Sequence, residues 1–299
     1  MTMLNLNKYS FCLISILILS GLNTGAIAQN GESKSEMLQN YTWRAIGPAN
    51  MGGRVTDIDG IPGDPSTFYV SGADGGIHKT IDGGVSFEPI FENQRAYSIG
   101  ALTIAPSDNN VLWVGTGEGD PRNSVGYGWG VYRSVDAGKS WKHLGLKKTE
   151  RIKRIVVDPN NPDIACVCAL GKEWGANKER GVFKTTDGGK SWNKILYIDD
   201  NTGCSDIAME NDNPRIMYAG MWTFRRKPWR FDDGGKNTAI YKTMDGGSTW
   251  EKIMKGLPKT DMARPGIHIA QNDPNIVYLI TEFEGGGTWL CNIRSVKSK

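Results

Sequence analysis

The chain contains 299 residues, with 35 lysines and arginines against 32 aspartates and glutamates, so its formal net charge is only +3. This near balance gives no electrostatic reason to expect a nucleic acid as partner, and the length fits one large all-β domain rather than two ordinary ones. The 38 glycines and 10 tryptophans suit many short strands joined by tight turns.

The first 28 residues have the composition of a secretory signal peptide. Lys8 supplies the positive charge, residues 11–19 form the apolar segment, and Ala26 and Ala28 mark the expected cleavage site. The apolar segment is too short to span a membrane, and no other stretch approaches the ~20 apolar residues required. We therefore predict a secreted or periplasmic protein with no membrane span after cleavage, and a flexible leader over residues 29–40.

From residue 41 onward the chain repeats one short pattern, with a period of about 50 residues. The pattern is Ser/Thr-x-Asp-x-Gly-x-Ser/Thr-aromatic, and a run of apolar, aromatic and basic residues precedes each copy. The four copies occupy residues 80–87, 134–141, 185–192 and 243–250. A repeat of this length indicates an architecture built from similar units that pack on one another.

Each copy has the composition of a tight hairpin turn. The aspartate, which is Asp82, Asp136, Asp187 or Asp245, can accept hydrogen bonds from backbone amides one or two residues ahead. The glycines tolerate a positive φ, and the aromatic residue five positions after the aspartate is expected to start the next strand and pack into the core. We therefore predict a structural role for these four aspartates.

This pattern is the Asp-box, and with four copies the chain resembles the Asp-box (BNR-like) β-propeller proteins, which include sortilin-type receptors, sialidases and xyloglucan hydrolases. The resemblance covers residues 41–289 and points to the amino-terminal part of long secreted bacterial proteins described as sortilin-like or glycosyl-hydrolase-like. It implies an all-β propeller of four-stranded antiparallel blades, with four complete blades and a partial fifth within residues 41–290.

The repeat stops in the fifth unit, because residues 288–299 contain no Asp-box, and we predict an irregular tail over residues 291–299. Two closures of the propeller remain open. Residues 42–47 match the strand that follows the second box, and they could complete the last blade of a five-bladed ring. Alternatively, the chain forms the first part of a larger propeller, which is the closure that we favour.

Four cysteines follow the signal peptide, at Cys166, Cys168, Cys204 and Cys291. Cys166 and Cys168 lie on the same face of one predicted strand, which is a poor geometry for a bond between them. The sequence has no Cys-x-x-Cys motif, and its three histidines are far apart. We therefore expect no metal site and no cofactor, and we interpret the cysteines as small buried residues.

Long segments separate the second and third strands of blades two, three and four, at residues 117–129, 171–180 and 221–233. Because these connections lie on one face of a propeller, opposite the Asp-boxes, we expect the three inserts to converge there. They carry aromatic rings, which stack on sugars or peptide side chains, and arginines, which bind carboxylates. The candidate ligand-binding residues are Arg122, Trp129, Trp174, Trp222, Arg225, Arg226, Trp229 and Arg230. The alternative is that the inserts pack on one another and plug the channel.

A glycoside hydrolase needs two carboxylates beside the scissile bond. The resemblance to xyloglucan hydrolases implies a catalytic aspartate in an Asp-x-Gly-Gly turn after the second strand of an early blade, and Asp74 occupies a similar turn. That turn is one residue shorter here, and in that family the second acid belongs to a separate propeller. Glu118 and Asp120 are the candidate partners in this chain. The arginine motif of sialidases is not matched at residues 44–48.

Together these patterns predict a secreted, sortilin-like Asp-box β-propeller that acts as a binding module. Its ligand would be a protein, a peptide or a carbohydrate held on the loops opposite the boxes. The alternatives are a glycoside hydrolase of the xyloglucanase-like class and an inactive truncated fragment of such an enzyme.

Overall fold

The structure is a computed structural model that describes residues 54–257, 259–284 and 288–294. The predicted signal peptide, the leader and the strand predicted over residues 42–47 lie outside these residues. The described chain is almost entirely β-structure, and its one helix is the short 3₁₀ segment η1 (Lys147–Thr149). No helix in this part of the chain has the length and apolar character of a membrane span.

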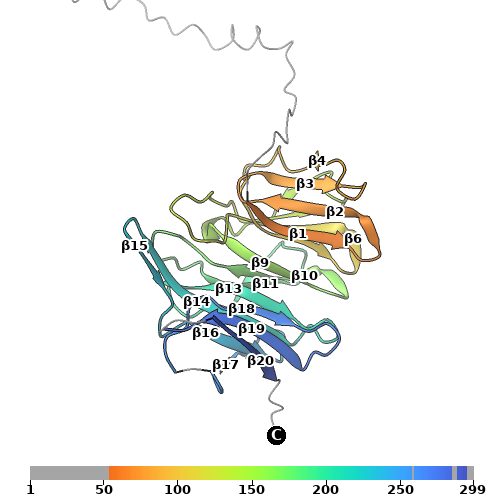
Figure 1. The fold of residues 1–299 in the computed structure, drawn as a ribbon. Helices are drawn as coiled ribbons and strands as arrows, with labels where there is room; N and C mark the ends of the chain where they lie inside the picture. The colour runs from red at the N-terminus through yellow and green to blue at the C-terminus, as the bar shows by residue number, and fades with distance from the viewer. Residues whose placement is uncertain (1–53, 258, 285–287, 295–299) are drawn as a thin grey trace, which may run out of the picture. The chain divides into compact units, whose positions relative to one another are not determined.

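Five antiparallel sheets follow one another along the chain, as Figure 1 shows. The first sheet contains β1 (Val55–Ile61), β2 (Asp64–Gly72), β3 (Gly76–Thr80) and β4 (Glu88–Pro89). The second contains β5 (Ile99–Ala105), β6 (Asp108–Thr116), β7 (Val131–Ser134) and β8 (Lys142–His143). The third contains β9 (Ile152–Asp158), β10 (Asn161–Ala169), β11 (Gly181–Thr185) and β12 (Asn193–Leu196).

The fourth sheet contains β13 (Thr202–Met209), β14 (Met217–Lys227), β16 (Ala239–Thr243) and β17 (Glu251–Ile253), and β15 (Arg230–Asp233) pairs with the end of β14. The fifth contains β18 (Gly266–Ile269), β19 (Ile276–Glu282) and β20 (Thr288–Arg294). These sheets confirm the predicted all-β propeller with four complete blades and a partial fifth.

The fifth sheet extends further along the chain than the sequence suggested. β20 pairs with β19 as far as Arg294, so residues 291–294 belong to a strand and not to the irregular tail that we predicted from residue 291. The stretch lacks an Asp-box, but its sequence keeps the apolar and aromatic residue types that favour a strand. Loss of the turn motif therefore does not imply loss of strand pairing.

The first strands of the blades line a common central channel. β1, β5, β9, β13 and β18 pack on one another in this order and surround a cavity of about 300 Å³. Asp57 and Asp59 of β1 reach across to blade two, where they accept hydrogen bonds from the backbone amides of Leu102 (3.1 Å) and Ile104 (2.8 Å). Burial raises the pKa of both aspartates. The amide donors compensate for the water that these carboxylates lose, so the bonds hold blade one against blade two.

The Asp-boxes share one hydrogen-bonding pattern. In the second box, Asp136 accepts bonds from the Ser134 hydroxyl (2.7 Å) and from the backbone amide (2.8 Å) and hydroxyl (2.5 Å) of Ser140. The partner amide lies four residues ahead of the aspartate, not one or two as we predicted, because Ala137 and Gly138 both have positive φ and turn the chain back over the carboxylate. The same bonds form at Asp82, Asp187 and Asp245.

The second, third and fourth boxes also contact the blade before them. The Trp141 indole N–H donates to the carbonyl of Ile90 at 2.8 Å. One blade further on, Trp192 donates to the carbonyl of Leu144 at the same distance. Gly138 of the second box packs so closely on Ile90 that an added Cβ would lie 2.6 Å from its side chain. The boxes are therefore joints between neighbouring blades as well as turns within one blade.

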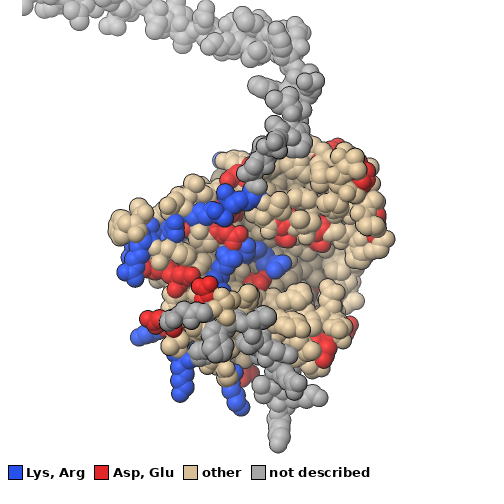
Figure 2. All heavy atoms as spheres, viewed as in Figure 1, with Lys and Arg blue, Asp and Glu red and all other residues tan. Residues whose placement is uncertain are grey.

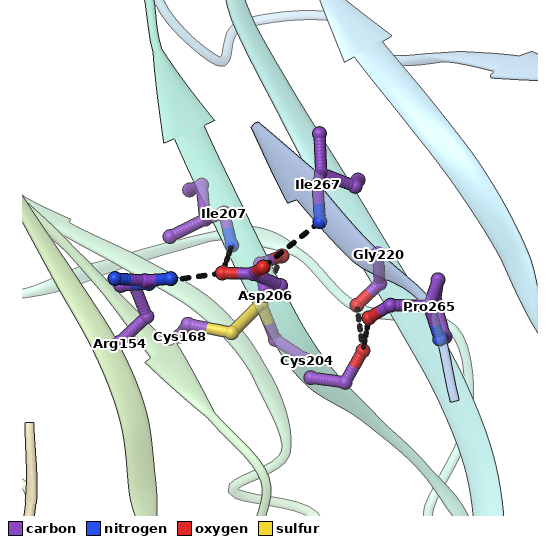
Figure 3. The surroundings of a disulfide bond; sticks show 9 residues. Arg154, Cys168, Cys204, Asp206, Ile207, Gly220, Pro265 and Ile267 are labelled. Carbon is purple, nitrogen blue, oxygen red and sulfur yellow. Dashed lines mark hydrogen bonds and ion pairs between the residues drawn. A yellow bond between two sulfur atoms is a disulfide. The ribbon is translucent and has the colours of Figure 1, made fainter. Parts of the chain in front are cut away.

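A disulfide between Cys168 of β10 and Cys204 of β13 joins blade three to blade four (Figure 3). The interpretation of Cys168 and Cys204 as small unpaired residues was therefore wrong, because the two cysteines lie 36 residues apart and only the fold brings their strands together. Cys166 is a buried free thiol, as expected, and its burial raises its pKa to about 12. A disulfide of this kind is typical of proteins in oxidising compartments.

Figure 3 also shows how blades three, four and five are linked beside the disulfide. Asp206 of β13 pairs with Arg154 of β9 at 3.0 Å and accepts a hydrogen bond from the Ile267 backbone amide of β18 at 2.9 Å. Asp206 therefore joins blade four to blade five in the way that Asp57 and Asp59 join blade one to blade two, by accepting a bond from a backbone amide of the next blade.

We expect the stability of the propeller to fall in acid through the Asp-boxes. Hydrogen bonds to Ser86 and Ser140 lower the pKa of Asp82 and Asp136 to about 2. A carboxyl whose pKa is depressed in the folded state stabilises the fold above its unfolded pKa of about 3.9, and this contribution is lost as the pH falls towards the folded value. The urea midpoint should therefore decrease between about pH 5 and about pH 2, and less so in an Asp82→Asn/Asp136→Asn variant. Equal decreases in both proteins would contradict this account.

The disulfide should contribute measurably to stability. A Cys168→Ala/Cys204→Ala variant is expected to lose about 2–4 kcal/mol of unfolding free energy, because the bond restricts the unfolded chain. Urea denaturation measures this loss. Cys166→Ala is the matched control in the same strand, since it removes a buried thiol but leaves the bond intact. A reducing agent should then destabilise the control but not the double variant; an effect on neither protein would refute the assignment.

Candidate functional site

The inserts of blades two and four meet on the face opposite the Asp-boxes. Each insert precedes the third strand of its blade and each box follows that strand, so the two lie at its opposite ends. Arg226 of the blade-four insert donates two hydrogen bonds, of 2.9 and 2.5 Å, to Asn123 of the blade-two insert. Arg225 lies beside Gly175 of the blade-three insert. These contacts bear out the convergence that the spacing of the repeats predicted.

The blade-four insert is a β-hairpin and not the loop that we expected. β14 continues to Lys227 and pairs with β15, so that Phe224 lies opposite Asp233 and Lys227 opposite Arg230. The hairpin extends from the edge of blade four in Figure 1. Alternation along β14 brings Trp222 and Phe224 into one buried cluster, and burial of these two rings stabilises the extended conformation.

Trp222 is not the exposed indole that the sequence suggested, since only 1% of its surface is accessible. Its ring stacks on Phe224 with centroids 4.5 Å apart, and its Nε1 donates to the Asp233 carboxylate at 2.8 Å. Trp229, at the turn of the hairpin, is 82% exposed. The two tryptophans of this insert therefore have different environments, and only Trp229 has a freely accessible ring.

The other predicted aromatic residues are partly accessible. Trp129 is half-buried between two cations, with the Arg95 guanidinium 3.8 Å and the Lys147 ammonium 5.2 Å from its ring centroid. It packs against the core between blades one and two. Trp174 of the blade-three insert is 41% exposed.

Two predicted arginines of the blade-four insert already have partners within the fold. Arg225 bonds to Asn201, and Arg230 pairs with Asp232 of the same hairpin.

A buried ion pair lies beneath the blade-three insert. The Arg151 and Glu173 side chains are inaccessible to solvent and lie 2.8 Å apart. Arg180, also fully buried, donates to the carbonyls of Leu170 and Lys172 at 2.8 and 2.7 Å. Burial lowers the pKa of both arginines and raises that of Glu173, although the opposite charges act against these shifts. These contacts fix the insert to the body of blade three.

The predicted acids Glu118 and Asp120 are both held by cations. Glu118 is 1% exposed, and it accepts hydrogen bonds from the Arg54 guanidinium at 2.8 and 2.6 Å, with Arg122 3.5 Å away. Asp120 lies 3.1 Å from Lys153 and 2.7 Å from Arg264. Burial alone would raise the pKa of Asp120, but the two cations outweigh it and lower that pKa.

Asp74 is the most accessible of the three predicted acids. Its side chain is 47% exposed and lies 3.9 Å from Arg54, the same guanidinium that binds Glu118. Burial and the nearby Glu118 charge raise the pKa of Asp74, against the opposing effect of Arg54. The structure therefore brings Asp74 and Glu118 together at one arginine, but only Asp74 has a carboxylate open to solvent.

A cavity of about 700 Å³ opens on the same face between blades two, four and five, and we call it the insert cavity. Its wall includes aromatic, basic and acidic side chains of these three blades: Asp120, Arg122, Trp222, Phe231, Asp233, Arg264 and Glu282. Figure 2 shows charged side chains gathered beside the β14–β15 hairpin, whereas the surface over β1 and β2 is largely uncharged. The cavity wall thus combines aromatic side chains with basic and acidic groups that can donate and accept hydrogen bonds.

Three charged residues of the insert cavity were not singled out from the sequence, namely Asp233, Arg264 and Glu282. Arg264 joins two blades, because it donates to Asp120 at 2.7 Å and lies 5.7 Å from the centroid of Trp222. A signal for Arg264 was present: it lies two residues before the first strand of blade five, and arginines directly precede the first strands of blades one and three, at Arg54 and Arg151. Within the described ranges, no group of three or more histidines, cysteines, aspartates and glutamates could hold a metal ion.

Comparison with known proteins gives two kinds of relatives. The model of the Sortilin-Vps10 family, described as "Sortilin, neurotensin receptor 3", matches residues 130–299. A xyloglucanase of Acetivibrio thermocellus is 31% identical over 285 residues, which cover 85% of this chain and 32% of the enzyme. An oligoxyloglucan-reducing end-specific xyloglucanase of Emericella nidulans is 29% identical over 189 residues, which cover 60% of this chain and 21% of the enzyme. The chain thus spans about a third or less of the length of these curated relatives.

Solved structures support the fold. An ancestral GH74 enzyme matches with a TM-score of 0.58 and 18% identity, over 82% of this chain and 31% of the enzyme. The GH74 xyloglucanase of Xanthomonas campestris matches with a TM-score of 0.56 and 18% identity, over 80% of this chain and 35% of the enzyme. At this level of identity the likeness concerns the fold alone.

The contrast between the two hairpin tryptophans can be tested by stability measurements. Trp222→Ala is expected to lower the free energy of unfolding by about 3–5 kcal/mol, because it empties a buried site and leaves Asp233 without its donor. Trp229→Ala, the matched control, should change it by less than about 0.5 kcal/mol. Chemical denaturation of both variants measures the difference. Similar losses in the two variants would mean that the hairpin packs in a different way.

Proposed function

This chain belongs to the Sortilin-Vps10 family, and from its site we propose that it is a secreted β-propeller module that binds a glycan in the insert cavity. The observation that carries this proposal is the composition of the cavity wall. The partly accessible ring of Phe231, which packs edge-on against the buried Trp222 ring, adjoins the guanidinium groups of Arg122 and Arg264 and the Glu282 carboxylate. Sugars present apolar C–H faces and many hydroxyl groups, and such a wall offers partners for both.

The size and order of the cavity also fit a ligand site. Its volume of about 700 Å³ lies within the range of small-molecule sites. Arg264 is held between Asp120 and the face of Trp222, and Lys153 holds Asp120 from its other side. Because these groups are already fixed, a ligand would lose little free energy in ordering them.

The relatives favour a carbohydrate over a protein or peptide ligand. The curated relatives are named as xyloglucanases, so a xyloglucan-type β-glucan is the first ligand to test. The family description names a neurotensin receptor, so a peptide is the alternative occupant of the same cavity. Arginines and carboxylates together could bind the charged ends of a peptide.

One observation favours hydrolysis as a second candidate function. Asp74 is half-exposed, has a raised pKa and occupies the turn that resembles the catalytic turn of xyloglucan hydrolases. A general acid requires such a raised pKa. Glu118, however, is buried and bound by two arginines, so it is poorly placed to serve as the second carboxylate. Binding is therefore the primary proposal.

Titration calorimetry with xyloglucan oligosaccharides tests the binding proposal. Arg264→Ala is expected to weaken binding about tenfold or more, because it removes a fixed donor and releases Asp120. Arg215→Ala is the matched control, since this exposed arginine lies beside the fourth Asp-box on the opposite face. Asp74→Asn should bind normally. Retention of peptides but of no member of a β-glucan panel would overturn the glycan assignment.

The hydrolase candidate is tested separately by release of reducing sugar from the same oligosaccharides. If the chain hydrolyses them, Asp74→Asn should reduce the rate by at least about a hundredfold without weakening binding. Trp229→Ala in the binding assay tests whether the site extends to the tip of the hairpin. The absence of sugar release from wild-type protein that binds the oligosaccharide would eliminate hydrolysis and leave the binding module.

A further inference from the structure

A second cavity, of about 310 Å³, lies between the end of the blade-four hairpin, β17 and the connection to blade five. Three lysines from these three segments line it: Lys236, Lys252 and Lys259. Thr260 and Asp261 complete its polar lining. We call it the lysine cavity.

The lysine cavity carries an uncompensated positive charge. Among the described residues, none of its three lysines forms an ion pair, and all three side chains are exposed. Asp261 is the single carboxylate of the lining, so the formal charges sum to plus two. Three ammonium groups that line one cavity favour an anion there, because an anion would be attracted to all three of them.

The backbone around this cavity is fixed by hydrogen bonds. The Thr238 amide donates to the Gly235 carbonyl at 2.9 Å, which closes the turn that carries Lys236. On the opposite side, the Leu257 amide donates to the carbonyl of Met254 at 3.2 Å. The Asp261 carbonyl accepts a bond from the Glu284 amide at 2.9 Å, so this segment is attached to blade five.

The floor of the lysine cavity is apolar and anchored. Met262 is 1% exposed and belongs to the core between blades four and five, against which Leu257 packs. The lysines therefore extend from a rigid base, and their long side chains can adjust the positions of the ammonium groups.

From this arrangement we propose that the lysine cavity is a binding site for a tetrahedral oxyanion, that is, a sulfate or phosphate group. The reasoning is geometric. Ammonium groups act as compact point charges, which can surround an anion whose oxygens point in several directions. A planar carboxylate is better matched by the two-pronged guanidinium of arginine, and no arginine lines this cavity. The Thr260 hydroxyl could supply a further donor.

The group could be carried by a larger ligand. Residues 261 and 262 line the lysine cavity, and residues 263 and 264 of the same segment line the insert cavity. A sulfated or phosphorylated glycan could therefore contact both cavities. The site itself does not depend on the proposed glycan-binding function, because inorganic anions alone can occupy it.

The test is a calorimetric titration of the whole chain at low ionic strength with four probes: inorganic sulfate, inorganic phosphate, a sulfated oligosaccharide and its unsulfated counterpart. We expect the Lys252→Gln/Lys259→Gln variant to bind the preferred anion at least about tenfold more weakly. Lys255→Gln is the matched control, because Lys255 lies in the same connection but outside the lining, and it should change affinity less than about twofold. Asp261→Asn should strengthen binding by a few fold, since it removes the one opposing charge.

Each outcome decides the proposal. Binding of sulfate with a gain for the sulfated oligosaccharide would identify a sulfated glycan, and binding of phosphate alone would identify a phosphate ester. No binding of either inorganic anion, equal loss in the Lys255→Gln control, or weaker binding in Asp261→Asn would overturn it. Xyloglucan binding should be unchanged in the lysine variants, so the two proposals can fail independently of each other.

Discussion

The hydrogen bonds around each Asp-box aspartate are the constraint on which the rest of the propeller depends. The carboxylate of Asp136 turns the chain through Ser140, and the same turn places the Trp141 indole on the carbonyl of Ile90 in the preceding blade. A single local motif therefore sets both the connection between the last two strands of a blade and its contact with its neighbour. The third box repeats both relations through Trp192 and the carbonyl of Leu144, and such repetition explains why similar sheets follow one another around a channel.

Because the box fixes one end of the third strand, the connection that enters the opposite end is free to vary in length. The inserts of blades two, three and four all enter the third strand at that end, and they differ in structure. The blade-two insert carries two acids, each held by basic side chains. The blade-three insert is fixed by the buried Arg151–Glu173 pair, and the blade-four insert forms a hairpin. The scaffold thus determines where a site can form, and the inserts determine its chemistry.

The features that the sequence predicted are those that rest on local interactions. The boxes and the blades they close are visible because every essential group lies within eight residues. The Cys168–Cys204 bond, the burial of Trp222 and the hairpin formed by β14 and β15 depend on contacts between segments distant in the sequence. Arg264 lies between these cases, since the recurrence of arginine before the first strands was visible but its contact with Asp120 was not.

The two cavities beside blade four differ chiefly in how their charges are paired. In the insert cavity, Asp120 and Arg264 bind each other, so these two charges balance within the wall, and we propose a ligand rich in hydroxyl groups. In the lysine cavity the three cations have no ion-pair partner among the described residues, and we propose a ligand that brings negative charge. The two cavities share the segment of residues 261–264, yet their ion pairs differ. Arg264 contacts the Asp120 carboxylate of blade two, while the three lysines pair with no carboxylate of the described residues. In both proposals, ligand class on this part of the molecule depends on which cations find a carboxylate within the fold, more than on the number of cations present.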